Sequence, residues 1–165
     1  MQKKILIIVF LSLIVSYIGY ELNYKSYLQA KGLQKSTIKT YDSAKDMENT
    51  FKEILSYRAL GNWEAKKRMY VMSRAIFMSN YGKKEIFYGF IDYSVTELKK
   101  ELSVRPKDYK CCILLSTLLI ALAENDKKYL PDATNYTKYC ARLSPKQHLT
   151  EVALNNLRIL NAKNR

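Results

Sequence analysis

The stretch ILIIVFLSLIVSYIGY, residues 5–20, has no charged side chain and follows a chain start that carries Lys3 and Lys4. A helix rises ~1.5 Å per residue and a bilayer core is ~30 Å thick, so a span needs about 20 apolar residues. After the single charge of Glu21, the uncharged residues 22–24 prolong the run. This stretch therefore predicts an N-terminal helix that is long and apolar enough to cross a membrane.

Three interpretations of this helix compete. A cleaved signal peptide needs small residues at its exit, whereas residues 16–20 read SYIGY, with bulky side chains where small ones belong. A buried helix of a soluble core fits poorly with a position at the terminus beside two lysines. We favour a retained single-pass transmembrane anchor over residues 1–24, and hence a membrane localisation. Aromatic rings with a polar tip favour the membrane interface, which predicts interfacial positions for Tyr17, Tyr20, Tyr24 and Tyr27.

The composition predicts an all-α protein with a basic surface. The chain has 165 residues, a net charge of +13, five glycines and three prolines, and it lacks alternating strand patterns. The basic charge is spread along the chain, which suits membrane lipid and an anionic glycolipid as partners. Nucleic acid is an unfavoured partner, because the chain has no zinc finger, Arg-rich arm or RNA-binding signature.

Apolar residues recur at helical spacing throughout the part that follows the anchor. Turn residues at positions 61–62 and 81–82, together with Pro106 and Pro145, separate the helices. Residues 25–36 are expected to be a connection, and the helices to cover residues 37–60, 63–80, 84–103, 109–124, 131–143 and 147–161.

Two of these helices carry more detailed expectations. The helix over residues 109–124, capped by Asp108, is apolar almost all round and should be the most deeply buried. Its apolar run is short for a second membrane span, although that alternative stays open. In the last helix, the side chains expected to face inward are Leu149, Val152, Ala153, Leu157 and Leu160.

Proline-punctuated helix pairs predict an antiparallel helical-hairpin array of the tetratricopeptide type over residues 37–165. The spacing from Pro106 to Pro145 exceeds the ~34 residues of that repeat, which an enlarged turn near residues 125–129 would explain. Ala133 and Cys140 fall at positions that need small residues. An ordinary helical bundle is the alternative.

The three cysteines are Cys111, Cys112 and Cys140. An odd number with an adjacent pair is neither a disulfide framework nor a metal motif. Packing in the core is the expected role. A single bridge between Cys140 and one of the pair stays open for an extracytoplasmic domain.

The chain shows little sign of catalytic chemistry. Its one histidine, His148, is expected to be exposed at a helix start, and no nucleophile or phosphate-loop motif is present. We therefore predict no catalytic residue, no metal site and no cofactor. The candidate partner or anion-binding surface is a basic helix flank made of Trp63, Lys66, Lys67, Arg68, Tyr70 and Arg74.

Three stretches together carry a family resemblance. Residues 20–30 leave the apolar helix, residues 51–65 join two helices, and proline-punctuated pairs follow from Val104. This layout resembles the C-terminal tail of O-antigen ligase/polymerase-like membrane proteins, in which the last membrane helix leads into degenerate tetratricopeptide-like helices. Such proteins carry their functional Arg and His residues in a large loop that this chain does not contain. The resemblance implies a tail or fragment without the catalytic core.

We therefore expect a membrane-anchored helical-repeat interaction domain with a protein partner, and expect this chain alone not to be an enzyme. The alternatives are an envelope or secretion scaffold unrelated to glycans, and a complete glycan-transfer enzyme. Lys3 and Lys4, which precede the apolar run, are outnumbered by three lysines that follow it, at positions 25, 31 and 35. This count leans slightly toward a cytoplasmic repeat domain.

Overall fold

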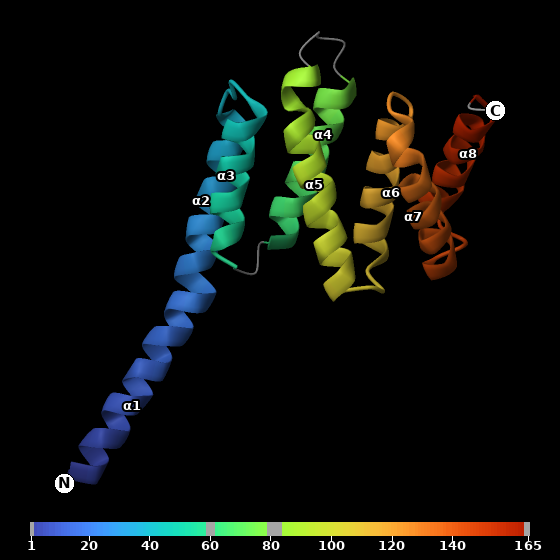
Figure 1. The fold of residues 1–165 in the computed structure, drawn as a ribbon. Coiled ribbons are helices and arrows are strands. Elements are labelled where there is room, and N and C mark those ends of the chain that lie inside the picture. The colour runs from blue at the N-terminus through green and yellow to red at the C-terminus, as the bar shows by residue number, and fades with distance from the viewer. Residues whose placement is uncertain (1, 59–61, 79–83, 164–165) are drawn as a thin grey trace. The chain divides into compact units, whose positions relative to one another are not determined.

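A computed structural model describes residues 2–58, 62–78 and 84–163, and all regular secondary-structure elements in these ranges are helices (Figure 1). The all-α fold class is confirmed. The chain divides into two compact units, residues 1–65 and 66–165. The elements are α1 (Gln2–Gly19), the π-helical turn η1 (Tyr20–Tyr24), α2 (Lys25–Ile38), α3 (Ala44–Ser56), α4 (Asn62–Met78), α5 (Lys84–Val104), α6 (Tyr109–Ala123), the 3-10 turn η2 (Lys127–Tyr129), α7 (Leu130–Leu143) and α8 (His148–Lys163).

In the first unit, α1, η1 and α2 form one continuous helix (Figure 1). The apolar side chains of α1 are exposed, with Leu6 at 75% and Val15 at 68%. The 18 residues of α1 span about 27 Å, and η1 extends the helix beyond that length. The only described segment apolar and long enough to cross a membrane lies in this helix, within residues 6–38. Its length and composition suit a membrane anchor and a signal sequence alike.

The segment predicted as a connection, residues 25–36, is instead helical and packs against α3. Gln29 explains the difference, because this polar side chain is fully buried and its amide nitrogen donates to the carbonyl oxygen of Ile54 at 3.1 Å. Gly32 lies beside it, and a Cβ there would come within 2.9 Å of the Cγ1 atom of Ile54. The backbones of α2 and α3 thus approach closely where glycine leaves room.

The next helix begins later than predicted, at Ala44 rather than Thr37. Residue 37 still belongs to α2, and Lys39 has an extended backbone that breaks the helix. Ser43 is the N-cap of α3, since its hydroxyl accepts a hydrogen bond from the backbone amide of Asp46 at 3.1 Å. The helix also ends earlier than predicted, at Ser56 rather than residue 60, and residues 59–60 lie outside the described residues.

In the second unit, α6 is the central helix and packs against α5, α7 and α8. Its expected burial is confirmed, with side chains such as Leu115, Leu118 and Leu119 at 1% exposure or less. The expected cap is confirmed too, because the Asp108 carboxylate accepts from the backbone amide of Cys111 at 3.0 Å. Burial among neighbouring helices explains why this helix is apolar all round.

A buried pair of hydroxyls joins the two helices of each hairpin in this unit. Ser73 of α4 donates to Ser94 of α5 at 2.9 Å, and the hydroxyls of Ser116 in α6 and Thr137 in α7 lie 2.7 Å apart. Both pairs are separated by 21 residues in the sequence. Ser94 and Thr137 each also donate to the carbonyl oxygen four residues earlier. The two hairpins therefore repeat one hydrogen-bonding arrangement.

The expectation for the last helix is wrong at two positions. Ala153, Leu157 and Leu160 are buried, but Leu149 is 55% exposed and Val152 38% exposed. These two side chains line a surface groove instead.

Candidate functional site: an interfacial tyrosine band and an apolar groove

The predicted interfacial tyrosines Tyr17, Tyr20, Tyr24 and Tyr27 recur at three- and four-residue intervals and are all roughly half exposed or more. The rings of Tyr20 and Tyr24 stack with centroids 5.6 Å apart. Lys25 lies with its ammonium 5.4 Å from the centre of the Tyr20 ring and pairs with Glu21 at 2.6 Å. The apolar helix thus ends in a band of aromatic and charged groups, the composition typical of a membrane–water boundary.

The predicted basic flank lies on α4 and is divided between surface and interior positions. Lys67 and Arg74 are exposed on α4, while Trp63 and Arg68 are half-buried. Lys66 is only 8% exposed, and its ammonium binds the Glu101 carboxylate at 2.7 Å. As a buried ion-pair partner, Lys66 is not part of an exposed anion-binding surface.

Tyr70 is also an interior residue, 7% exposed. Its hydroxyl lies 3.2 Å from the Thr117 hydroxyl of α6 and accepts a hydrogen bond from Arg74 at 3.3 Å. It therefore holds α4 against α6 and orients the Arg74 side chain. The exposed cations left on α4 are Lys67 and Arg74, which lie on one face of the helix at a seven-residue interval.

A groove of about 340 Å³ runs over α4, α6 and α8. Phe77 and Ile120 are buried in its lining, and the exposed side chains of Met78, Leu149 and Val152 add further apolar surface. Polar groups also line the groove, namely those of Arg74, Thr117, Glu124 and Asn156. A mainly apolar cleft with a few charged groups fits apolar side chains of a partner better than a sugar chain.

The sequence did not predict this groove. Leu149 and Val152 have the helical spacing of core residues, and spacing alone does not show that no helix covers them.

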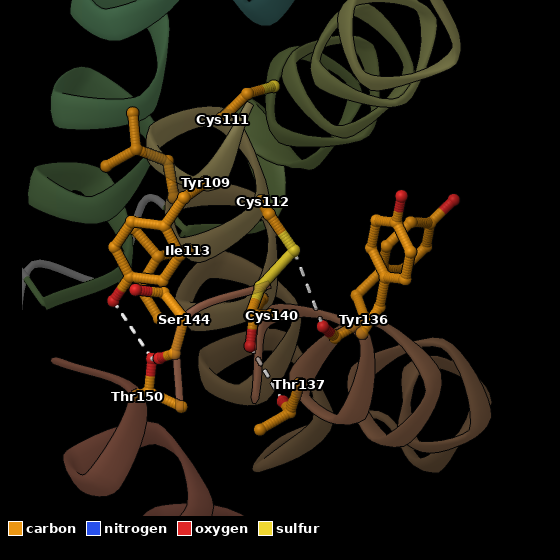
Figure 2. Close-up of a disulfide and its surroundings, with 12 residues drawn as sticks. Tyr109, Cys111, Cys112, Ile113, Tyr136, Thr137, Cys140, Ser144 and Thr150 are labelled. Atoms are coloured by element: carbon orange, nitrogen blue, oxygen red, sulfur yellow. Dashed lines mark hydrogen bonds between the residues drawn. A yellow bond between two sulfur atoms is a disulfide. The ribbon is translucent and has the colours of Figure 1, made fainter. Parts of the chain in front are cut away.

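Figure 2 shows the disulfide between Cys112 of α6 and Cys140 of α7, whose Cα atoms are 5.7 Å apart. Both side chains are fully buried. Cys111 is a free, buried thiol whose sulfur lies 3.4 Å from the carbonyl oxygen of Leu98 in α5. Burial, with the nearby carboxylates of Asp108 and Glu101, raises the pKa of the Cys111 thiol to about 12. The adjacent cysteines thus face different helices.

No group of His, Cys, Asp and Glu side chains with metal-binding geometry occurs among the described residues. His148 is the first residue of α8 and is exposed, as predicted. The bridge of Cys140 with one of the adjacent cysteines, which the sequence left open, is formed with Cys112.

Comparison with known proteins found no matching family model, no matching curated protein and no matching solved structure.

Proposed function

We propose that this chain is a membrane-anchored helical-repeat interaction protein of the cell envelope. The observation that carries the proposal is the combination of an N-terminal helix with exposed apolar side chains and a folded helical domain with an apolar surface groove. The repeated hydroxyl pairs of α4–α5 and α6–α7 support a repeat array over an irregular bundle. The sequence resemblance supports a role in surface-polysaccharide assembly.

The partner that suits the groove is a protein segment with apolar side chains one helical turn apart and a carboxylate beside them. Exposed apolar side chains such as Leu149 and Val152 would be covered by it. The net charge of +13 and the exposed guanidinium of Arg74 favour an acidic partner.

Leu149 and Ile159 provide a matched pair for a test. Both are on α8 and are exposed to 55% and 56%, but only Leu149 lines the groove. A photoreactive residue placed at position 149 of the full chain in its membrane should crosslink one defined protein, and the same residue at position 159 should not. The purified partner should then bind Leu149→Asp at least tenfold more weakly than Ile159→Asp. Equal crosslinking at both positions, or equal affinities, would refute the groove as the binding site.

The anchor is tested separately by deleting residues 1–24. The full chain should stay in the membrane pellet after salt and carbonate washes, and the deleted chain should leave it. A deleted chain that still pellets, or a mature protein whose mass shows that residues 1–24 have been removed, would contradict the single-anchor proposal.

An anionic glycolipid is a second candidate partner, favoured by the exposed cations Lys67 and Arg74 on one face of α4. The full chain in nonionic detergent would be titrated with micelles that contain a lipid-linked sugar phosphate or a neutral glycolipid. Selective binding of the phosphate, lost in Lys67→Glu and Arg74→Glu together, would support it. Equal binding of both lipids would exclude it.

A further inference from the structure

The disulfide in the second unit bears on which side of the membrane that unit folds. It joins Cys112 on α6 to Cys140 on α7, and both side chains are fully buried. Figure 2 shows the bridge between the two helices, close to the carbonyl oxygen of Tyr136, which lies 3.6 Å from the Cys112 sulfur. The bond therefore lies inside the hairpin rather than at its surface.

The pairing is selective because the two adjacent cysteines face different helices. Successive residues on a helix are rotated by about 100°. Cys112 points to α7, while the Cys111 sulfur lies against the carbonyl oxygen of Leu98 on α5. The buried Cys111 stays a neutral thiol because its pKa is raised to about 12, so it does not attack the neighbouring bond.

The hairpin positions Cys112 and Cys140 through further contacts of the same seam. Ser116 and Thr137 lie one turn from the bridge with their hydroxyls 2.7 Å apart, and Ala133 is fully buried below them. These small side chains let α6 and α7 approach closely. The α6–α7 packing thus keeps the two sulfurs in register with each other.

We propose that the soluble part of this chain folds on the oxidising, extracytoplasmic side of its membrane, with residues 1–4 on the cytoplasmic side. Structural disulfides persist in oxidising compartments, whereas the thiol systems of the cytoplasm keep the same cysteines reduced. The proposal rests on the membrane anchor of the proposed function, but not on the groove.

This orientation is the opposite of the cytoplasmic placement that the lysine count slightly favoured. The lysines that follow the apolar run lie on the continuous helix that enters α2, and α2 packs against α3. The Lys25 ammonium is paired with Glu21 at 2.6 Å. Long domains are translocated largely regardless of their charge, so lysines that belong to a folded unit set orientation less strongly than those of a short loop.

The oxidation is a thiol–disulfide exchange with a protein oxidant whose active site is a disulfide. One cysteine thiolate of this chain attacks a sulfur of that disulfide and forms a mixed disulfide. The second thiolate then attacks the sulfur of the first cysteine, and the oxidant leaves as a dithiol. Two electrons pass to the oxidant, and the two protons of Cys112 and Cys140 are taken up by its leaving thiolates. The whole exchange takes place before the sulfurs of Cys112 and Cys140 are completely buried.

The test uses the full chain in a bacterial host with a reducing cytoplasm and an oxidising periplasm. Cells are quenched in acid, the protein is denatured, and free thiols are blocked with a small maleimide. Disulfides are then reduced, and the released thiols are labelled with a large polyethylene-glycol maleimide that shifts the band on a gel. In parallel, spheroplasts are treated with a protease that cannot cross the inner membrane.

Wild-type protein should acquire two large labels, from Cys112 and Cys140. Cys111→Ser should also acquire two, whereas Cys112→Ser and Cys140→Ser should acquire none. A host without its periplasmic thiol oxidase should yield wild-type protein with markedly fewer labels. The protease should digest the soluble part in intact spheroplasts.

A wild-type chain without large labels, or a Cys111→Ser chain that loses them, would overturn the proposal. So would a soluble part that is protected in intact spheroplasts and digested only after lysis. Such results would leave the crosslinking at position 149 unaffected, whereas loss of the anchor would be seen as a chain absent from the membrane pellet. The failures of the two proposals are therefore distinguishable.

Discussion

The buried ion pair between Lys66 and Glu101 allows a quantitative test of the second unit. Their side chains are only 10% and 13% exposed, and the ammonium nitrogen lies 2.7 Å from the carboxylate. Glu101 has a further partner, since the Arg105 guanidinium lies 3.4 Å from its other oxygen. Among these contacts, Lys66 depends on Glu101 alone, so the two residues should respond differently to substitution.

Glu101→Met leaves the Lys66 ammonium buried without a counter-charge, and an unpaired buried charge costs about 3–5 kcal/mol. Lys66→Met leaves Glu101 in contact with Arg105, and losing one charged hydrogen bond of two should cost about 1–2 kcal/mol. The double variant removes both charges and fills the space with apolar side chains, so it should lie within about 1 kcal/mol of wild type. The double variant should thus be at least about 3 kcal/mol more stable than additivity predicts.

The assay is native-state amide hydrogen exchange of α6, measured by mass spectrometry on the full chain in mild detergent. The free energy of opening of α6 reports the stability of the unit in which it is the central helix. Lys100→Met is the matched control, because Lys100 pairs with Glu97 at the same 2.7 Å but its side chain is 64% exposed. The control should change stability by less than about 0.5 kcal/mol. If Glu101→Met cost no more than this control, or if the two single costs added, the Lys66 and Glu101 charges would not be energetically coupled.

Three further perturbations have defined outcomes. Reducing the Cys112–Cys140 bond should destabilise the second unit by about 3.5 kcal/mol, because the bond closes a loop with a separation of 28 residues and so limits the entropy of the unfolded chain. Amide exchange of α6 with and without reductant measures this loss. In the Cys112→Ser variant, the exchange should not respond to reductant. Asp108→Ala removes the cap of α6 and should cost about 1 kcal/mol in the same assay. Gly32→Ala should lower the stability of the first unit by up to about 2 kcal/mol, because the clash of the new Cβ with Ile54 outweighs a helix-propensity gain of about 1 kcal/mol. Hydrogen exchange of the α3 amides measures this loss. Gly19→Ala, where a new Cβ meets no atom within 4 Å, should not lower stability, and a loss there equal to that at Gly32 would contradict the close-approach argument.

Several features of the fold were predictable because they depend on local sequence. Asp108 caps α6 within its own turn, and Pro106 precedes that turn, so the boundary of α6 needs no tertiary information. The apolar composition of α6 likewise predicted its burial. Ala133 and Cys140, which the repeat pattern marked as small positions, are both fully buried.

Other features depend on partners that are distant in sequence. Gln29 has the polarity of a loop residue, but its amide reaches the Ile54 carbonyl 25 residues away, and α2 is buried there. Lys66 has the charge of a surface residue, and its partner Glu101 is 35 residues away. In each case a long-range polar contact provides a partner for a side-chain nitrogen that local propensity would leave in water. No property of the short segment alone shows that such a partner exists.

The same reasoning explains why the seam between α6 and α7 is made of small polar residues rather than leucine. Leucine would fill the space but would not fix the register of two helices, whereas the Ser116–Thr137 pair loses its hydrogen bond if the helices slide. The disulfide from Cys112 to Cys140 fixes that register covalently. The equivalent seam between α4 and α5 has a hydroxyl pair, Ser73 with Ser94, and no bridge. The groove spans α4, α6 and α8, so a locked α6–α7 hairpin would hold the α6 part of its lining in place while α4 adjusts to a bound segment.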